Sequence, residues 1–514
     1  MIRLSRESKE GLRGHGIVLL GTQAGYLDYF AESLPELAGQ VEAVYSLRPQ
    51  GKRERQTIQL GQRELRVQDG ELLHENGLMG CVPFIMSDYE QEVLSWLYER
   101  LGDLPEQVYW FASRETAQEI EFRERYADEA LQNWLIFRSG PHEDAFVPGM
   151  DFADNARALF EYMLLQRMHK RWRLIWLVKE PSSPRYDRYR DFSNVEFLSF
   201  DWPRTGTLED RERYYRAMCL AKFIFFTDAY GFARRCRQDQ VRVQLWHGCG
   251  IKRRVNFTPC ENRYEYTTVI SKLYADLHQR DYGLRPDQML VTGYPKEDWL
   301  YHPVIDFVER FHLPQARKYI FWLPTFRTAR AGLEMLDEQA ETGEIGLPLV
   351  YTLADLARLD EELARLDIVL IVKLHPFQRR EVVARWNFAQ LVCLENEDLL
   401  KEDVQINQLL ACADALISDY SSAAIDFTLL DKPIAFTLDD YEIYGGSRGF
   451  NWPNIRDWLP GVELFTFEDM MRFVREVAEG IDSSREKRHK LDSLFHSFHD
   501  DKSSERVLKA LGIE

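Results

Sequence analysis

Short apolar runs alternate with amphipathic stretches along most of this chain. A continuous apolar run is typical of a parallel strand buried on both faces, and an amphipathic stretch with a period near 3.6 residues is typical of a helix. In the larger, carboxyl-terminal part, the runs that predict strands are Trp134–Phe137, Leu174–Val178, Val195–Phe200, Phe223–Thr227, Val241–Trp246, Thr267–Ile270, Met289–Thr292, Tyr319–Leu323, Ile368–Leu374, Ala415–Ser418 and Ile434–Leu438. The alternation predicts an α/β protein built from βαβ units with parallel sheets.

The same alternation divides the chain into three blocks. Residues 1–130 predict an N-terminal α/β domain of unknown role, in which His15–Leu20 and Val41–Ser46 have the pattern of strands. Residues 131–260 and residues 261–514 each carry enough strands and helices for a parallel α/β domain. Two such domains in succession leave a cleft between them, and ligands of open α/β sheets bind beyond the carboxyl ends of the strands.

Polar residues and glycines follow the predicted strands of the two larger domains. They are, in chain order, His247 and Gly248, Gly293 to Lys296, Pro324 to Arg327, Lys373 and His375, and Ser421, Ser422 and Asp426. Each has an ordinary structural explanation by itself, because a histidine at a strand end or a serine before a helix usually caps a turn or the helix. Their coincidence on one inferred edge predicts a functional site.

The chemistry of these residues favours an anionic, nucleotide-type substrate. A serine pair that opens a helix offers hydroxyls and free N–H groups at the positive end of the helix dipole, which suits a phosphate. Lys252, Arg327 and Lys373 can neutralise the same charge, and a neutral histidine can act as a base. Asp426 comes one helical turn after Ser422, so it can accept hydrogen bonds from substrate hydroxyls.

Composition narrows the class of protein further. The chain has 83 acidic and 65 basic residues and a formal net charge of −18, which argues against nucleic acid as the main partner. No apolar run approaches the roughly 18 residues of a spanning helix, and the start lacks a secretory signal, so we expect a cytoplasmic protein. The seven cysteines are scattered and form no metal-site spacing, so we expect free thiols. We expect no obligatory metal cofactor, although Mg²⁺ bound through the substrate stays open.

The amino-acid sequence at the strand ends resembles the motifs of the CDP-glycerol glycerophosphotransferase family over about residues 133–480. The motifs are Gln244-Leu245-Trp246-His247-Gly248 with Lys252, Val291 to Asp298, Leu323-Pro324-Thr325-Phe326-Arg327, Lys373-Leu374-His375-Pro376, and Ser418 to Ser422 followed by Asp426-Phe427, with Asp154-Asn155 upstream. The resemblance implies a GT-B-like architecture with two Rossmann-like domains facing across a cleft. It also implies transfer of glycerol phosphate from CDP-glycerol to a hydroxyl of a growing teichoic-acid or capsule polymer, or of a lipid-linked or glycan acceptor, with release of CMP.

The resemblance also implies roles for individual residues. His247 would be the general base, and His375 would steady the pyrophosphate or the leaving group. Residues implied to bind substrate are Gly248, Cys249, Gly250, Ile251, Lys252, Lys296, Pro324, Thr325, Arg327, Lys373, Ser421, Ser422 and Asp426. Residues 131–260 would face the acceptor and residues 261–514 would bind the CDP donor, with the last helix crossing back.

Two departures from the family pattern leave the identity of the donor undecided. Cys249-Gly250 stands where the family commonly has Thr-Pro, and Lys296 stands where arginine is common, which gives up a bidentate phosphate contact. CDP-ribitol is therefore an alternative donor. A nucleotide-sugar glycosyltransferase of the same architecture is the main rival function, and a non-catalytic nucleotide-binding protein is a third.

A membrane contact is a further hypothesis, because acceptors in this family are often lipid-linked. The stretch Arg157–Arg173 combines an apolar segment with several cations, so it could lie on an anionic leaflet at the inner face of the cytoplasmic membrane. The favoured interpretation is a buried amphipathic helix whose cations lie at its carboxyl end.

Overall fold

The computed structural model of the 514-residue chain forms two compact units. It describes residues 2–3, 12, 14–22, 24–47, 57–73, 77–78, 80–87, 90–105, 107–111, 114–140, 149–228, 237, 239–253, 264–324, 345–373, 386–447 and 449–513. The N-terminal unit comprises Met1–Ala130 with Phe200–Leu220, and the larger unit comprises Leu131–Ser199 with Ala221–Glu514.

The described residues of the N-terminal unit form a sheet of seven strands in the order β1-β7-β6-β2-β3-β5-β4. The strands are β1 (Ile2–Arg3), β2 (Ile17–Leu20), β3 (Val41–Ser46), β4 (Thr57–Leu60), β5 (Arg63–Asp69), β6 (Val82–Ile85) and β7 (Tyr109–Trp110), and only the β4–β5 pair is antiparallel. The helices are α2 (Ala24–Ser33), α3 (Pro35–Ala38), η1 (Gly70–Leu72), α5 (Glu90–Leu101), α6 (Arg114–Arg125), α9 (Trp202–Thr205) and α10 (Leu208–Leu220). Alternate residues of β2 enter different cores, Leu19 with Phe30 of α2 and Leu20 with Leu97 of α5, so helices cover both faces of this sheet.

Helix α10 belongs with α6 in the N-terminal unit. Phe122 stacks on Tyr215 with ring centroids 4.7 Å apart, and Arg125 forms an ion pair with Glu212 at 2.6 Å. The prediction that residues 131–260 form one continuous domain is wrong here, because a helix between two strands can join either neighbouring core.

The first sheet of the larger unit is parallel throughout, in the order β10-β9-β8-β11-β12-β13-β14. Its strands are β8 (Gln132–Gly140), β9 (Arg173–Val178), β10 (Val195–Ser199), β11 (Ala221–Asp228), β12 (Val241–Gln244), β13 (Tyr266–Val269) and β14 (Met289–Val291). Its helical segments are η3 (Met150–Phe152), α7 (Asp154–Leu165), η4 (Met168–Lys170), η5 (Pro184–Tyr186), α8 (Asp187–Arg190), α11 (Lys272–Tyr282), η7 (Pro286–Gln288) and η8 (Pro295–Tyr301).

The expected domain boundary at residue 260 is also wrong. Val243 of β12 pairs with Tyr266, and Thr268 of β13 pairs with Leu290, so β13 and β14 extend the first sheet. Periodicity identified these two strands correctly but could not say which sheet they join, because that depends on pairing between strands.

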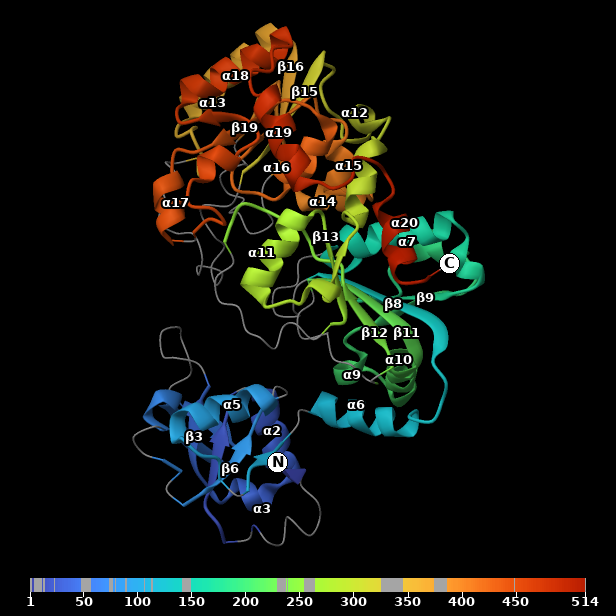
Figure 1. The fold of residues 1–514 in the computed structure, drawn as a ribbon, viewed down its shortest axis with the longest axis vertical. Coiled ribbons are helices and arrows are strands. Elements are labelled where there is room, and N and C mark those ends of the chain that lie inside the picture. The colour runs from blue at the N-terminus through green and yellow to red at the C-terminus, as the bar shows by residue number, and fades with distance from the viewer. Residues whose placement is uncertain are drawn as a thin grey trace. The chain divides into compact units, whose positions relative to one another are not determined.

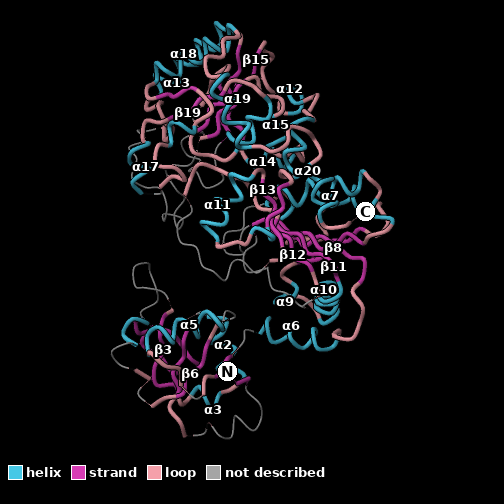
Figure 2. The backbone as a smooth tube through the Cα atoms, in the orientation of Figure 1, coloured by secondary structure: helices cyan, strands magenta, loops and turns pink. Residues whose placement is uncertain are grey.

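The second sheet is parallel in the order β17-β16-β15-β18-β19-β20. Its strands are β15 (Lys318–Leu323), β16 (Ile368–Lys373), β17 (Leu391–Leu394), β18 (Ala415–Ser418), β19 (Ile434–Thr437) and β20 (Val462–Leu464). Its helical segments are α12 (Phe307–Arg310), α13 (Leu353–Leu366), α14 (Asn396–Lys401), α15 (Ile406–Leu410), α16 (Ala423–Phe427), η9 (Thr428–Leu430), α17 (Tyr441–Ser447), η10 (Ile455–Trp458), α18 (Phe467–Glu479) and α19 (Arg485–Phe495). Helices lie beside both sheets of the larger unit (Figure 2).

Local sequence explains the elements of this second domain. All six residues of β16 are buried, as expected for a central parallel strand. Helix α13 begins at a capping box in which Thr352 Oγ1 accepts from the backbone N–H of Asp355, and α18 begins in the same way at Thr466. The buried faces of these two helices pack in one core with the strands.

The chain returns to the first domain at its carboxyl end. Helix α20 (Ser503–Ala510) places Val507 and Leu508 in one core with Leu135 of β8. The Asp298 carboxylate accepts from the backbone N–H groups of Ser503 and Ser504 at 2.8 and 2.9 Å. Figure 1 shows this red helix beside α7.

Helix α7 is buried, as the favoured interpretation of the stretch that begins at Arg157 predicts, but it ends at Leu165 with no basic residue in its last turn, so the predicted cations at its carboxyl end are wrong. The Arg157 side chain is 1% exposed and forms ion pairs with Glu161 at 2.9 Å and with Asp403 at 2.8 Å. Leu159 and Met163 lie in the core of the first sheet. Within the described part of the chain, every helix is too short or too polar to span a bilayer.

Candidate active site

A cleft of about 740 Å³ lies between the two domains of the larger unit. The second sheet reverses its strand order between β15 and β18, and Leu323 and Pro324, at the end of β15, line the cleft. His247 lines the cleft from the first domain. Ligands of open α/β sheets bind where the strand order reverses, so this cleft is the expected binding position.

The backbone turns sharply where His247 follows strand β12. Trp246 is in the left-handed conformation, with φ +60°, which is strained for a residue of this size. The Gln244 Oε1 atom accepts from the Trp246 N–H at 3.0 Å, and Thr268 Oγ1 donates to Leu245 O at 2.7 Å. The buried indole of Trp246 lies nearly parallel to the exposed imidazole of His247, at 5.3 Å between ring centroids. The turn therefore directs the imidazole into the cleft.

Gly248 brings this turn against the serine-rich start of α16. A Cβ atom on Gly248 would lie 2.6 Å from Ser422 Oγ, so no larger residue fits without movement. The next residues attach to the second domain, since Asn451 donates from its backbone to Ile251 O and from its side chain to Gly250 O, both at 2.9 Å. Residues from both domains therefore meet within a few ångströms of His247.

Lys296 is the central cation of the cleft. Its ammonium donates to His247 O at 2.6 Å and forms ion pairs with Asp426 at 3.1 Å and Asp154 at 3.9 Å. Burial by itself would lower the pKa of Lys296, but the two carboxylates outweigh it and raise the pKa above its usual value. Lys296 thus stays charged and is already bonded to protein groups.

The two carboxylate oxygens of Asp426 differ in their hydrogen bonds. Its Oδ2 accepts from Lys296 and, at 3.3 Å, from Asn407 Nδ2, whereas its buried Oδ1 has no hydrogen-bond partner among the described residues. Ser422, one turn earlier, makes no side-chain cap for α16. Both Asp426 and Ser422 line the cleft.

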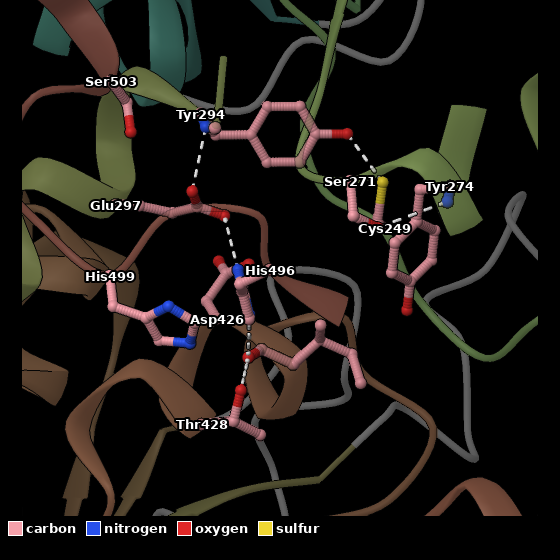
Figure 3. Close-up of polar contacts among 12 residues, drawn as sticks. Cys249, Ser271, Tyr274, Tyr294, Glu297, Asp426, Thr428, His496, His499 and Ser503 are labelled. Carbon is pink, nitrogen blue, oxygen red and sulfur yellow. Dashed lines mark hydrogen bonds and ion pairs between the residues drawn. The ribbon is translucent and has the colours of Figure 1, made fainter. Parts of the chain in front are cut away.

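Two buried polar side chains, Glu297 and His496, link the backbone of Tyr294 to the helix that carries Asp426 (Figure 3). Glu297 Oε2 accepts from the backbone N–H of Tyr294 at 2.9 Å, and Glu297 Oε1 lies 3.9 Å from His496 Nδ1. His496 Nε2 donates to Ile425 O at 3.0 Å, on the helix that carries Asp426. Burial raises the pKa of Glu297 well above its usual value and lowers the pKa of His496.

Lys373 ends strand β16 and reaches the cleft from the second domain. Its ammonium donates to Asn396 Oδ1 at 2.8 Å. Burial lowers the pKa of Lys373 to about 8, because the charged form loses its hydration. An anionic ligand would restore the favourable environment of this cation.

Cys249 is a structural thiol and not a nucleophile. Its Sγ lies 2.8 Å from the hydroxyl of Tyr294, and Figure 3 shows the two side chains in contact. Burial raises the pKa of Cys249 far above its usual value, so the reactive thiolate is not formed near neutral pH. The five described cysteines are free thiols, as expected.

The cleft brings together most of the residues predicted to form a site. Those that line it are His247, Gly248, Cys249, Gly250, Lys252, Lys296, Pro324, Lys373, Ser421, Ser422 and Asp426. Ile251 does not line the cleft, because its side chain is buried in a core to which both domains of the larger unit contribute. Thr325, Arg327 and His375 lie outside the described residues.

Several site residues carry no role in the sequence prediction. Asn155 accepts a hydrogen bond from the backbone of Lys296, which lines the cleft. Gln405 and Asn407 line the cleft themselves, and Asn407 also donates to Asp426. Asp154-Asn155 was part of the family resemblance, which is the one signal that pointed to this position.

In the described residues, no group of three or more His, Cys, Asp or Glu side chains could hold a metal ion, and the expectation of no obligatory metal stays a prediction.

The two parallel α/β domains and the cleft between them place the protein in the GT-B-like class. The model of the family described as CDP-glycerol:poly(glycerophosphate) glycerophosphotransferase matches residues 145–512. The chain therefore belongs to this family. The resemblance drawn from the strand-end motifs is confirmed.

Individual relatives agree with this assignment. The chain is 24% identical over 392 residues to the teichoic acid glycerol-phosphate transferase of Staphylococcus aureus, which covers 71% of this chain and 90% of the relative. It is 25% identical over 296 residues to the teichoic acid ribitol-phosphate primase of Bacillus spizizenii, covering 53% and 69% respectively. A solved structure of the wall teichoic acid polymerase TagF is similar with a TM-score of 0.57 and 19% identity, covering 82% of this chain and 96% of that chain, which confirms the GT-B-like fold.

Proposed function

We propose that this chain transfers glycerol phosphate from CDP-glycerol to a hydroxyl of a growing teichoic-acid-type polymer and releases CMP. The observation that carries the proposal is the position of His247 in one cleft with Ser421, Ser422 and Lys373. Hydroxyls and an ammonium ion suit the pyrophosphate of a CDP-linked donor. An exposed imidazole beside them suits the acceptor hydroxyl.

In this proposal, each residue of the cleft has a separate role in the reaction. His247 takes the proton of the acceptor hydroxyl, whose oxygen forms a bond to the phosphorus that carries glycerol. The bond from this phosphorus to the oxygen of CMP breaks, and CMP leaves with the electron pair. Ser421, Ser422 and Lys373 stabilise the charge on the phosphates. The unbonded Oδ1 of Asp426 accepts from a donor hydroxyl.

Lys296 has a different role in this proposal from the one that the resemblance implied. Its ammonium already contacts His247 O and Asp426 Oδ2. It therefore holds the base and the carboxylate in place instead of reaching the donor as a free cation.

CDP-ribitol is a second candidate donor. The ribitol-phosphate primase of Bacillus spizizenii is among the relatives, at 25% identity. The Cys249-Gly250 and Lys296 departures also lie at the cleft. A longer alditol carries additional hydroxyls, and Gln405 and Asn407 offer amide groups on the cleft wall.

A panel of donors tests the proposal. The protein is incubated with CDP-glycerol, CDP-ribitol or a nucleotide sugar together with a polymer acceptor. Chromatography identifies the nucleotide product, and mass spectrometry identifies the extended acceptor. We expect CMP and an acceptor longer by one glycerol phosphate, with undiminished turnover in EDTA. Release of CDP or UDP would instead show a glycosyltransferase.

The low pKa of Lys373 predicts a pH dependence. The free enzyme holds the Lys373 ammonium below a pH of about 8 and loses it above, so kcat/KM for the anionic donor should fall as the pH rises through this value. Arginine stays charged throughout. A kcat/KM profile that keeps the same descending limb in Lys373→Arg would contradict the assignment.

The site of action is part of the same proposal. The protein works in the cytoplasm, beside the inner face of the membrane, where a lipid-linked acceptor would lie. Sedimentation with vesicles that carry such an acceptor, compared with plain vesicles, measures this association.

A further inference from the structure

Asn155 connects three segments of the active site without lining the cleft itself. It is the second residue of α7, and its side chain is completely buried. Both hydrogens of its amide are used, since Nδ2 donates to Leu245 O at 3.1 Å and to Trp246 O at 2.9 Å. Its Oδ1 accepts from the backbone N–H of Lys296 at 3.0 Å.

These bonds fix both peptide groups that flank His247. The carbonyl of Trp246, before His247, is held directly by Asn155. The carbonyl of His247 itself is held by the Lys296 ammonium, and the backbone of Lys296 is held by Asn155. Because Trp246 has a strained positive φ, its conformation persists only where the surrounding bonds determine it.

We propose that Asn155 is a positioning residue for His247 in the transfer reaction. The inference rests on the proposed function, because it gives His247 the role of base. Asparagine suits this position because it supplies two donors and one acceptor from one planar group. Aspartate has the same shape, but it lacks the two donors and would add a negative charge next to Asp154 and near Asp426.

The variant Asn155→Asp separates positioning from donor binding. The donor-side residues Ser421, Ser422 and Lys373 make none of the Asn155 bonds, so affinity for CDP-glycerol should change by less than about threefold. A misplacement of about 1 Å at a reacting group can cost about 100-fold in rate, and we expect a loss of kcat of this order. Titration calorimetry with CDP-glycerol and steady-state CMP release measure the two quantities.

A double variant tests whether the effect passes through His247. In the His247→Ala background, Asn155→Asp should lower the residual rate by no more than about threefold, because the group being positioned is already absent. An equal loss in both backgrounds, or a loss of donor affinity that matches the loss of kcat, would overturn the proposal.

Leu164→Ala, on the same helix, is the matched control for stability. Leu164 lies in the core of the first sheet and outside the cleft, so this variant lowers Tm without changing the Asn155 bonds. It should keep the wild-type kcat at temperatures below its Tm. A loss of kcat as large as in Asn155→Asp would mean that Asn155 only stabilises α7. Asn155→Ser replaces Asn155→Asp if the aspartate variant does not fold.

A readout independent of turnover keeps this inference separate from the proposed function. Protein labelled with ¹³C at the histidine rings gives a His247 NMR signal, assigned by its loss in His247→Ala. In Asn155→Asp this signal should shift or broaden while Leu164→Ala leaves it in place. An unchanged His247 signal would overturn the positioning role, whichever nucleotide the wild-type enzyme releases.

Discussion

Replacing His247 with alanine is expected to lower the turnover of glycerol phosphate transfer by about 1000-fold, within the range for loss of a general base. CDP-glycerol should still bind with nearly wild-type affinity, because the pyrophosphate contacts proposed above come from Ser421, Ser422 and Lys373. The imidazole is exposed at a cleft that also contains cations, carboxylates, hydroxyls and amides. Steady-state CMP release and calorimetric titration with CDP-glycerol measure the two effects.

His302→Ala is the matched control for this substitution. His302 is an exposed histidine that pairs with Asp501 at 3.0 Å and does not line the cleft, so its loss should leave turnover unchanged. Wild-type turnover in His247→Ala would refute the base assignment. A loss of CDP-glycerol binding in that variant would instead make His247 a donor-binding residue.

The second large effect is expected for Lys296→Met. Removing this ammonium leaves Asp426 buried without its ion pair, and breaking a buried pair in this way typically costs about 3–5 kcal/mol of stability. The variant also releases the carbonyl of His247, so transfer should fall together with the free energy of unfolding. Urea denaturation and CMP release measure these changes.

Two further variants define what Lys296 contributes. Lys272→Met removes an exposed lysine that pairs with Asp276, and such surface pairs contribute about 0–1 kcal/mol. Lys296→Arg keeps the charge and should preserve most of the stability. If Lys296→Met were as stable as Lys272→Met, the buried ion pair would not hold the site together.

The sequence predicted the strands and the residues that follow them because both depend on local pattern. A buried parallel strand is a short apolar run, and its carboxyl end must leave the sheet at a known edge. His247, Lys373 and Ser421 were therefore found from order along the chain alone. The family resemblance added roles to these positions, since spacing cannot distinguish a base from a capping residue.

What the sequence did not predict depends on contacts between distant segments. Strands β13 and β14 have the pattern of any parallel strand, and only their pairing with Val243 and with each other assigns them to the first sheet. Asn155 has the pattern of a polar residue at a helix start. Its function in the fold depends on Trp246 and Lys296, which lie 91 and 141 positions away.

The crossing of the last helix back to the first domain affects the order in which the protein can fold. Val507 and Leu508 complete a core that begins with Leu135, so this core draws on residues near both ends of the larger unit. During synthesis the apolar surface of the first domain is fully covered only after helix α20 has been made. The first domain therefore completes its core after the strands of the second domain have been synthesised, although its own strands come first in the chain.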